Sequence, residues 1–264
     1  MRDLKDDKRF ANTLARGLSV LRAFRPTDKG LGNLEISERT GLPRSTVSRL
    51  TFTLCALGYL THRRHHDKYY LGPAALALGN IAAASFGFIE TASPIMQNLA
   101  NATKTLIGVA IQDDGQMLVV KTWRPENTPP IWINVGYRMP ILTSSTGAAY
   151  LGVLTDEEQE KLTTAVQGNQ TNQYGKVGRK ARSDLLAQGY SVVSGSERFS
   201  SSINAVATPY RPSEFAEPVA FLSGAPTESL SDERIQAEVG PALVQAVEEL
   251  RSITGQYYSL VATS

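Results

Sequence analysis

Residues 33–63, NLEISERTGLPRSTVSRLTFTLCALGYLTHR, decide the fold of the N-terminal part of this 264-residue chain. Gly41 lies between two segments of helical pattern, and glycine adopts the positive φ of a sharp turn without steric cost. Asn33 can cap the first helix, and Pro43 suits the start of the second, where its missing N–H costs nothing. The stretch therefore predicts a helix-turn-helix.

Each of the two predicted helices has an apolar side at helical spacing. We expect the following residues to face the core: Leu34, Ile36 and Leu42, then Val47, Leu50, Leu54 and Leu57. The other side of the second helix carries Arg44, Ser45, Thr46, Ser48 and Arg49. Hydroxyls can bond phosphates and arginine can pair with a guanine edge, so this side suits the major groove of DNA. A merely solvated helix face is the alternative interpretation.

A β-hairpin is predicted directly after the second helix. Residues 58–63 and 69–72 have strand character, and the polar run 64–68 indicates a turn between them. A hairpin in this position is the wing of a winged helix, and its basic tip can reach phosphates or the minor groove. The residues we expect to do so are Arg63, Arg64 and His65.

All three histidines of the chain fall in this hairpin, at His62, His65 and His66. A metal site is one interpretation, but no cysteine accompanies them and the only nearby carboxylate is that of Asp67. Phosphate contact or plain solvation is favoured, and no metal or cofactor is expected.

Charge is segregated along the chain. Residues 1–72 contain 14 Lys and Arg against 7 Asp and Glu, whereas the remaining 192 residues contain 13 against 18. The N-terminal part therefore has a net charge of +7 and the rest a net charge of −5. A basic segment attracts the phosphate backbone of DNA, to which a base-contacting helix adds specificity.

Several features bound the class of protein. The single cysteine, Cys55, excludes an intramolecular disulfide framework, and its place among apolar residues indicates a small buried side chain. The longest apolar run, residues 74–88, is interrupted by Gly79, Asn80 and Gly87, so no membrane span is expected. The charged N-terminus lacks the apolar core of a signal peptide. We therefore expect a cytoplasmic protein.

Three domains are predicted: residues 10–72 as the DNA-binding domain, 73–90 as an apolar connecting helix, and 91–264 as a second domain. A helix capped at Asn12 or Thr13, with Leu14, Leu18, Leu21 and Phe24 facing inward, should pack beneath the helix-turn-helix. The second domain mixes both periodicities, which predicts an α+β fold with an antiparallel sheet flanked by helices. Its expected strands are 106–112, 116–123, 131–135, 190–193, 203–208 and 219–222; its expected helices are 92–102, 145–154, 156–166, 176–188 and 234–251.

No catalytic constellation is apparent in the second domain. No histidine lies beyond residue 66, and there is no phosphate-binding glycine loop of either common type. The acidic run at 156–160 suits the first turn of a helix, where the macrodipole favours negative charge. The sequence therefore predicts a binding domain rather than an enzyme.

The stretch 136–147, GYRMPILTSSTG, leads into an Ala-rich helix. Small hydroxyl residues before a helix present N–H groups and side-chain donors to an anion, so Ser144 and Ser145 are candidate ligand-binding residues. A plain N-cap is the alternative for either serine. Ser223 and Gly224 could add a second polar wall, and Trp123, Trp132 and Tyr137 could line a pocket or belong to the core.

The order of these segments resembles the IclR family of bacterial transcriptional regulators over residues 10–254. The resemblance rests on LARGLSVLRAF (14–24), ISERTGLPRSTVSRLTFTLCALGYL (36–60), YYLGPAALALG (69–79), GYRMPILTSSTGAAYLGVL (136–154), GYSVV (189–193), NAVATPY (204–210) and FLSG (221–224). It implies a winged helix-turn-helix, a linker helix that dimerises, and a GAF/PAS-like effector-binding domain. It also implies a homodimer or a tetramer that binds double-stranded DNA at a palindromic operator.

The same resemblance implies an effector site for a small organic or aromatic acid. By matching motifs, this site takes in Ser144, Ser145, Thr146, Glu197, Ala205, Phe221 and Ser223. Ala205 stands where many members have cysteine, and SGSERFSSS (194–202) matches the family poorly. The expected function is transcriptional regulation in which an effector modulates operator affinity. A regulator without an effector and an enzyme tethered to a DNA-binding head are the two alternatives.

Overall fold

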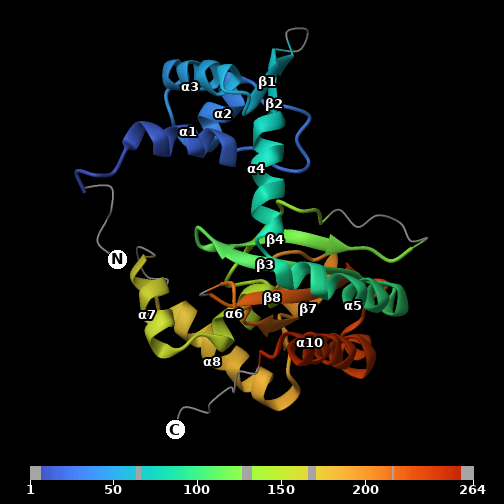
Figure 1. Cartoon of the computed structure of the whole chain (residues 1–264). Coiled ribbons are helices and arrows are strands. Elements are labelled where there is room, and N and C mark those ends of the chain that lie inside the picture. The colour runs from blue at the N-terminus through green and yellow to red at the C-terminus, as the bar shows by residue number, and fades with distance from the viewer. Residues whose placement is uncertain (1–6, 64–66, 127–132, 166–170, 216, 257–264) are drawn as a thin grey trace. The chain divides into compact units, whose positions relative to one another are not determined.

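The computed structural model describes residues 7–63, 67–126, 133–165, 171–215 and 217–256. The chain divides into two compact units, Met1–Phe86 and Gly87–Ser264, each with its own hydrophobic core (Figure 1). Five residues with roles expected from the sequence lie outside the described ranges: Arg64, His65, His66, Ile131 and Trp132.

The first unit is a winged helix. Its elements are α1 (Asn12–Arg22), α2 (Asn33–Thr40), α3 (Arg44–Ala56), β1 (Leu60–Arg63), β2 (Lys68–Leu71) and α4 (Pro73–Ala84). The two strands are antiparallel, with Leu60 opposite Leu71, and Leu31 adds a bridge to Tyr69. The buried core consists of Val20, Leu31, Ile36, Val47 and Leu60, and Cys55 packs against it. The predicted helix-turn-helix and hairpin are confirmed.

The turn between α2 and α3 forms as its sequence predicts, but the start of α2 does not. Gly41 ends α2 at φ 69°, and its N–H donates to the carbonyl of Ser37. The N-cap is Gly32, whose N–H donates to the Glu35 carboxylate at 2.7 Å. Asn33 is instead the first helical residue, and its side chain accepts a hydrogen bond from Thr51 at 3.3 Å. Asn33 therefore does not cap α2; its side chain links α2 to α3.

Some of the leucines expected in this core are exposed. They are Leu14, Leu18, Leu34 and Leu57. In α1 the core-facing stripe consists of Gly17, Val20 and Leu21, and Phe24 just after the helix packs against the same core. Leu14 lies one turn ahead of that stripe and Leu18 lies beside it. Helical periodicity located an apolar side correctly but not its limits.

The predicted helix over 73–90 is two helices. Ser85 and Phe86 close α4 with hydrogen bonds to Ala82 and Ala83, three residues back, which tightens the last turn and ends the helix. The next helix, α5 (Gly87–Thr103), begins the second unit. Among the described residues no single helix is long and apolar enough to cross a membrane; α4 and α5 reach that threshold only when taken together, by length and composition.

The second unit is built on a six-stranded antiparallel sheet in the order β5-β4-β3-β8-β7-β6. The strands are β3 (Leu106–Asp113), β4 (Gln116–Trp123), β5 (Arg138–Pro140), β6 (Ser191–Val192), β7 (Ile203–Tyr210) and β8 (Val219–Pro226). The register pairs Val109 with Phe221 and Ala205 with Gly224. Residues 133–135 are not a strand, and the edge strand is β5 instead. The predicted α+β fold is confirmed.

Helices cover both faces of this sheet. On one face α6 (Ser145–Val153) and α8 (Thr171–Gln188) pack over a core that includes Ala207, Ala220 and Leu222. On the other face α5 and α10 (Gly240–Thr254) pack over an aromatic cluster of Phe88, Trp123, Tyr210 and Phe221 (Figure 1). Alternate residues of β8 therefore serve two different cores, as strand geometry requires.

The remaining helical segments of the unit are a short 3₁₀ helix (Gly195–Glu197), a helix after α6 and a closing helix. Helix α7 (Asp156–Ala165) opens with a capping box, because Thr155 Oγ1 accepts from the Glu158 N–H at 3.2 Å and Glu158 accepts from the Thr155 N–H at 2.8 Å. The predicted closing helix begins as α9 (Asp232–Arg234) and passes through a π-helical turn at Ile235–Val239 before α10. Pro241, at the start of α10, has no N–H to continue the α-helical ladder, which accounts for the change in winding.

Candidate functional site

One side of α3 is an exposed stripe of hydrogen-bond donors. Arg44, Ser45, Ser48 and Arg49 are exposed, and Thr46 beside them is half-buried. The four exposed side chains form no hydrogen bond or ion pair within the described part of the chain. No acidic residue occurs in α3. These donors are therefore available to a ligand outside the chain, and nothing on the helix opposes an anion.

The opposite side of α3 is fixed in the core. Val47 is fully buried, and so is Thr51, whose hydroxyl lies within hydrogen-bond reach of the Ser48 carbonyl at 3.1 Å and of Asn33 at 3.3 Å. The Ser37 hydroxyl donates to the Leu42 carbonyl at 2.6 Å and braces the turn before the helix. The fold thus presents the donors on a rigid element, as recognition of DNA requires.

Two basic side chains of the wing, Arg63 and His62, make contacts within the hairpin. Arg63 at the end of β1 lies with its guanidinium 4.7 Å from the ring centre of Tyr70. His62 bonds to Asp67 at 3.1 Å and stacks on Tyr69 at a centroid distance of 4.6 Å. His62 therefore stabilises the hairpin. The Arg63 guanidinium stacks on the Tyr70 ring near the tip of the wing.

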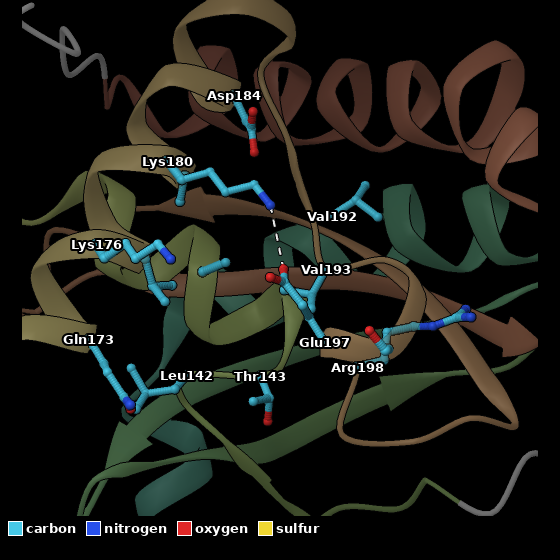
Figure 2. Close-up of a pocket in the computed structure, with 14 residues that line it drawn as sticks. Leu142, Thr143, Gln173, Lys176, Lys180, Asp184, Val192, Val193, Glu197 and Arg198 are labelled. Atoms are coloured by element: carbon cyan, nitrogen blue, oxygen red, sulfur yellow. Dashed lines mark ion pairs between the residues drawn. The ribbon is translucent and has the colours of Figure 1, made fainter. Parts of the chain in front are cut away.

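The second unit contains a pocket of about 440 Å³ between α8 and the segments 142–148 and 192–198 (Figure 2). Its lining residues are Leu142, Thr143, Ala148, Gln173, Lys176, Val177, Lys180, Ala181, Asp184, Val192, Val193, Ser196, Glu197 and Arg198. Its size falls within the range of small-molecule sites, and apolar walls with a few polar groups are typical of them.

Charge in the pocket is mixed: two lysines of α8 lie near the carboxylates of Asp184 and Glu197. Lys180 Nζ lies 3.6 Å from Glu197 Oε2, an ion pair drawn in Figure 2. Lys176, one turn earlier on α8, forms no ion pair among the described residues. Asp184, one turn later, has its carboxyl pKa raised by burial. Arg198 also lines the pocket, but its side chain is directed away from both lysines (Figure 2), and its Nε donates to the Gly195 carbonyl at 3.3 Å. Two lysines therefore face the pocket, and the ammonium group of Lys176 is free to bind an anionic ligand.

Of the seven predicted effector residues, only Glu197 lines this pocket. Ser144 is the N-cap of α6: its hydroxyl accepts from the Gly147 N–H at 3.1 Å and donates to the Pro140 carbonyl at 2.7 Å. Ser144 is therefore a plain N-cap, which was the alternative to a ligand-binding role. Ser145 donates to the Ala205 carbonyl at 2.7 Å and accepts from the Val193 N–H at 3.0 Å. These contacts connect α6 to strand β7 and to Val193, a residue of the pocket wall.

Of the other predicted residues, Thr146, Phe221 and Ser223 are buried, whereas Ala205 is half-buried and does not line the pocket. Thr146 is buried against Met139. Phe221 and Ser223 lie on the sheet face opposite α6, because Ala220 and Leu222, which alternate with them along β8, face α6. Ser223 Oγ is 2.7 Å from Thr105 Oγ1, in a buried hydroxyl chain that continues to Thr103. The structure thus separates Phe221 and Ser223 from Glu197.

The charged wall from α8 was missed by sequence reasoning. Lys176, Lys180 and Asp184 recur every four residues, so they share one side of a helix that the sequence does predict. That spacing was an available signal for a charged face. Its direction toward residues 192–198 depends on long-range packing and could not be inferred locally.

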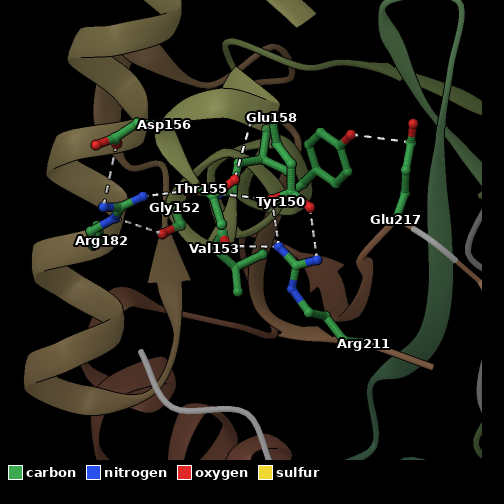
Figure 3. Close-up of polar contacts among 10 residues, drawn as sticks. Tyr150, Gly152, Val153, Thr155, Asp156, Glu158, Arg182, Arg211 and Glu217 are labelled. Carbon is green, nitrogen blue, oxygen red and sulfur yellow. Dashed lines mark hydrogen bonds and ion pairs between the residues drawn. The ribbon is translucent and has the colours of Figure 1, made fainter. Parts of the chain in front are cut away.

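The carboxyl end of α6 is held by two arginines (Figure 3). Arg182 from α8 donates to the carbonyls of Gly152 and Leu154. Arg211 donates to the Val153 carbonyl at 3.1 Å and forms a paired ion bridge to Glu158 at 2.7 and 2.9 Å. Cations at the carboxyl end of a helix satisfy its free carbonyls and favour its dipole. The contacts fix α6, which carries Ala148 of the pocket wall.

Two family models match the chain. The IclR helix-turn-helix domain matches residues 13–64, and the model described as bacterial transcriptional regulator IclR C-terminal matches residues 81–251. The HTH-type transcriptional regulator TsaQ1/TsaQ2 of Comamonas testosteroni is 26% identical over 246 residues, covering 92% of this chain and 88% of that protein.

Solved structures show the same fold. An IclR family transcriptional regulator from Brucella abortus gives a TM-score of 0.76 at 31% identity, covering 95% of each chain. An IclR homolog from Microbacterium hydrocarbonoxydans, complexed with 4-hydroxybenzoate, gives a TM-score of 0.67 at 20% identity. It covers 91% of this chain and 99% of its own, and at that identity the likeness is one of fold.

Proposed function

This chain belongs to the IclR family of bacterial transcriptional regulators, and from that premise we propose that a small carboxylate bound in its second unit controls its affinity for DNA. The family consists of DNA-binding regulators with a helix-turn-helix and not of enzymes. The observation that carries the proposal is the combination of a free donor stripe on α3 with a pocket in the other unit that contains Lys176, a cation without an ion pair among the described residues.

For DNA we propose that α3 enters the major groove. Arg49 and Arg44 reach base edges or phosphates, and Ser45, Thr46 and Ser48 contact the backbone or bases beside them. Arg63 contacts the backbone from the wing, and Arg64 and His65 stay predictions of the same kind. The support is the exposure of the α3 side chains, their lack of partners within the described chain, and the absence of acidic residues from the helix.

For the effector we propose a small organic or aromatic acid in the pocket beside α8. Lys176 and Lys180 bind its carboxylate, and Leu142, Val177 and Val193 contact its apolar part. The 4-hydroxybenzoate complex of the Microbacterium homolog supports this ligand class. Ser145 and Thr146 contribute by holding the start of α6 in place rather than by facing the ligand.

We propose that two copies associate through α4. The helix PAALALGNIAAA has no charged residue, and Asn80 is its one polar side chain, a composition typical of a buried helix. None of its residues is buried in the single chain, and Leu76 and Ile81 are 67% and 68% exposed. A homodimer, or a tetramer built from two dimers, covers this surface and presents two α3 helices to a palindromic operator.

The test has two stages. Thermal-shift measurements on the full chain against small carboxylates, with 4-hydroxybenzoate among them, identify ligands. DNA fragments selected from a random library by the full chain are then titrated with and without each ligand. We expect a ligand that raises the melting temperature also to change DNA affinity, because binding linkage is reciprocal. Selected DNA whose affinity responds to no carboxylate would contradict effector control while leaving DNA binding intact.

A further inference from the structure

Phe52 is the most exposed of the large apolar side chains in the described chain, at 76% exposure. It lies on α3, where Val47 and Thr51 face the core and Leu50 and Leu54 pack against it. Single exposed apolar residues are common on protein surfaces and need no explanation of their own. Phe52 differs because of the residues that surround it.

The exposed residues of α3 form one stripe that includes Phe52. Helical spacing places Phe52 one turn after Ser48 and Arg49 and two turns after Ser45, on the same side. From Ser45 to Phe52 the helix rises about 10 Å, which spans about three base-pair steps. A helix whose first turns contact bases therefore brings Phe52 to the same groove.

The neighbours of Phe52 determine which occupant suits it. Arg49 lies on the preceding turn and Arg44 begins the helix, while α3 has no acidic residue. Residues 1–72 have a net charge of +7, so a second copy of this face would meet it with like charge. DNA offers the complementary charge, and its only apolar group in the major groove is the thymine methyl.

We propose that Phe52 contacts thymine methyl groups and makes the operator preference of this protein depend on thymine at one or two positions of each half-site. The inference rests on the proposed placement of α3 in the major groove. Arginine and hydroxyl donors specify the neighbouring base pairs, and Phe52 selects thymine because burying a methyl group against its ring removes apolar surface from water.

The experiment uses the full chain and DNA enriched from a random double-stranded library. Each thymine of the enriched sequence is replaced in turn by uracil, which removes the 5-methyl group and leaves all hydrogen-bonding groups in place. We expect one or two positions per half-site at which the wild-type protein binds about fourfold more weakly for each methyl lost. Phe52→Ala should show no dependence at those positions, and Phe52→Leu should retain part of it.

Leu57→Ala is the matched control. Leu57 is also exposed, but it lies about 140° around the helix from Phe52 and outside the stripe. Its removal should leave the uracil profile unchanged. Circular dichroism confirms that each variant is folded, and sedimentation shows whether its oligomeric state is that of the wild type.

Three outcomes overturn the proposal. Uracil substitution without effect on the wild type shows that no methyl group is contacted, and an equal effect on wild type and Phe52→Ala assigns the contact to another residue. A change in oligomeric state specific to Phe52→Ala assigns the side chain to a protein interface. Enrichment that yields no preferred sequence contradicts instead the proposed base-reading role of α3, on which the inference rests.

Discussion

Glu197 lies with its carboxylate 3.6 Å from the ammonium group of Lys180, across the mouth of the pocket in the second unit. The two side chains are 71% and 65% exposed, so the ion pair is solvated and weak. The position that an effector carboxylate would take beside Lys180 is therefore already occupied by a carboxylate of the chain itself. Glu197 competes with the ligand that we propose.

Glu197→Gln should therefore raise the affinity for small carboxylates. Exposed ion pairs contribute about 0.2–1 kcal/mol, so the gain should not exceed about fivefold. Calorimetric titration with a series from acetate to benzoate measures it, and Lys180→Gln should weaken the same ligands. Glu157→Gln is the control, because Glu157 forms a similarly exposed pair with Lys161 away from the pocket. Equal affinities for wild type and Glu197→Gln would contradict the competition.

Arg49→Ala tests the base-reading role of α3. If Arg49 contacts a base, the variant should lose about 1–3 kcal/mol on enriched DNA and less on random DNA, so that specificity is relaxed. Fluorescence anisotropy on both DNAs at fixed salt measures the difference. Arg16→Ala removes the same charge from α1 and gives the loss due to electrostatics alone. Equal losses on the two DNAs would make Arg49 a phosphate contact.

The local chemistry of the first unit explains why so much of it could be predicted. Gly41, Pro43 and the period of Val47, Leu50 and Leu54 act over a few residues, so the sequence alone locates the turn and both helices. The predicted N-cap at Asn33 was wrong because the role of that side chain depends on a distant residue. Its side chain is taken by Thr51, eighteen residues away, and no local rule predicts that contact.

The ligand site was predicted less well, because it depends on which face of the sheet each residue occupies. Ser223 and Phe221 lie on β8, a buried strand whose apolar residues face both ways, so periodicity does not distinguish its sides. The hydroxyls of Ser144 and Ser145 were correctly placed at a helix start, yet both are engaged by the chain. The charged residues of α8 meet Glu197 only through tertiary packing.

Glu158→Gln should destabilise the second unit near neutral pH. Glu158 is half-buried in a paired bridge with Arg211, and this hydrogen bonding lowers the pKa of its carboxyl below the ordinary value of 4.5. A lowered pKa means that the stabilisation is fully present above about pH 4.5 and is lost as the pH falls through the folded-state value.

The expected loss in Glu158→Gln is about 1–3 kcal/mol in the free energy of unfolding near pH 7, and it should shrink on acidification. Urea unfolding followed by circular dichroism at a series of pH values measures this. Glu157→Gln, one residue earlier and exposed, is the control. A loss that stays constant down to the most acidic pH would show that the bridge is not its cause.

Ile81→Glu should dissociate the proposed dimer. The substitution places two like charges close together in an apolar interface between identical helices, where a buried charge without a partner is strongly unfavourable. Sedimentation velocity at micromolar concentration should show a dimer or tetramer for the wild type and a monomer for the variant. Leu186→Glu on α8 changes an equally apolar, exposed residue of the second unit and should leave the assembly unchanged. A monomeric wild type would contradict association through α4.

Ser145→Ala separates a structural role from direct ligand contact. The Ser145 hydroxyl donates to the Ala205 carbonyl and accepts from the Val193 N–H, so the variant leaves a half-buried carbonyl and a half-buried N–H without this partner. We expect a loss of about 1–3 kcal/mol in stability, together with weaker carboxylate binding because Val193 belongs to the pocket wall. Thermal unfolding and calorimetry measure the two effects. Ser196→Ala, which changes a hydroxyl lining the pocket, should alter stability little. Unchanged stability with lost binding in Ser145→Ala would instead place its hydroxyl on the ligand.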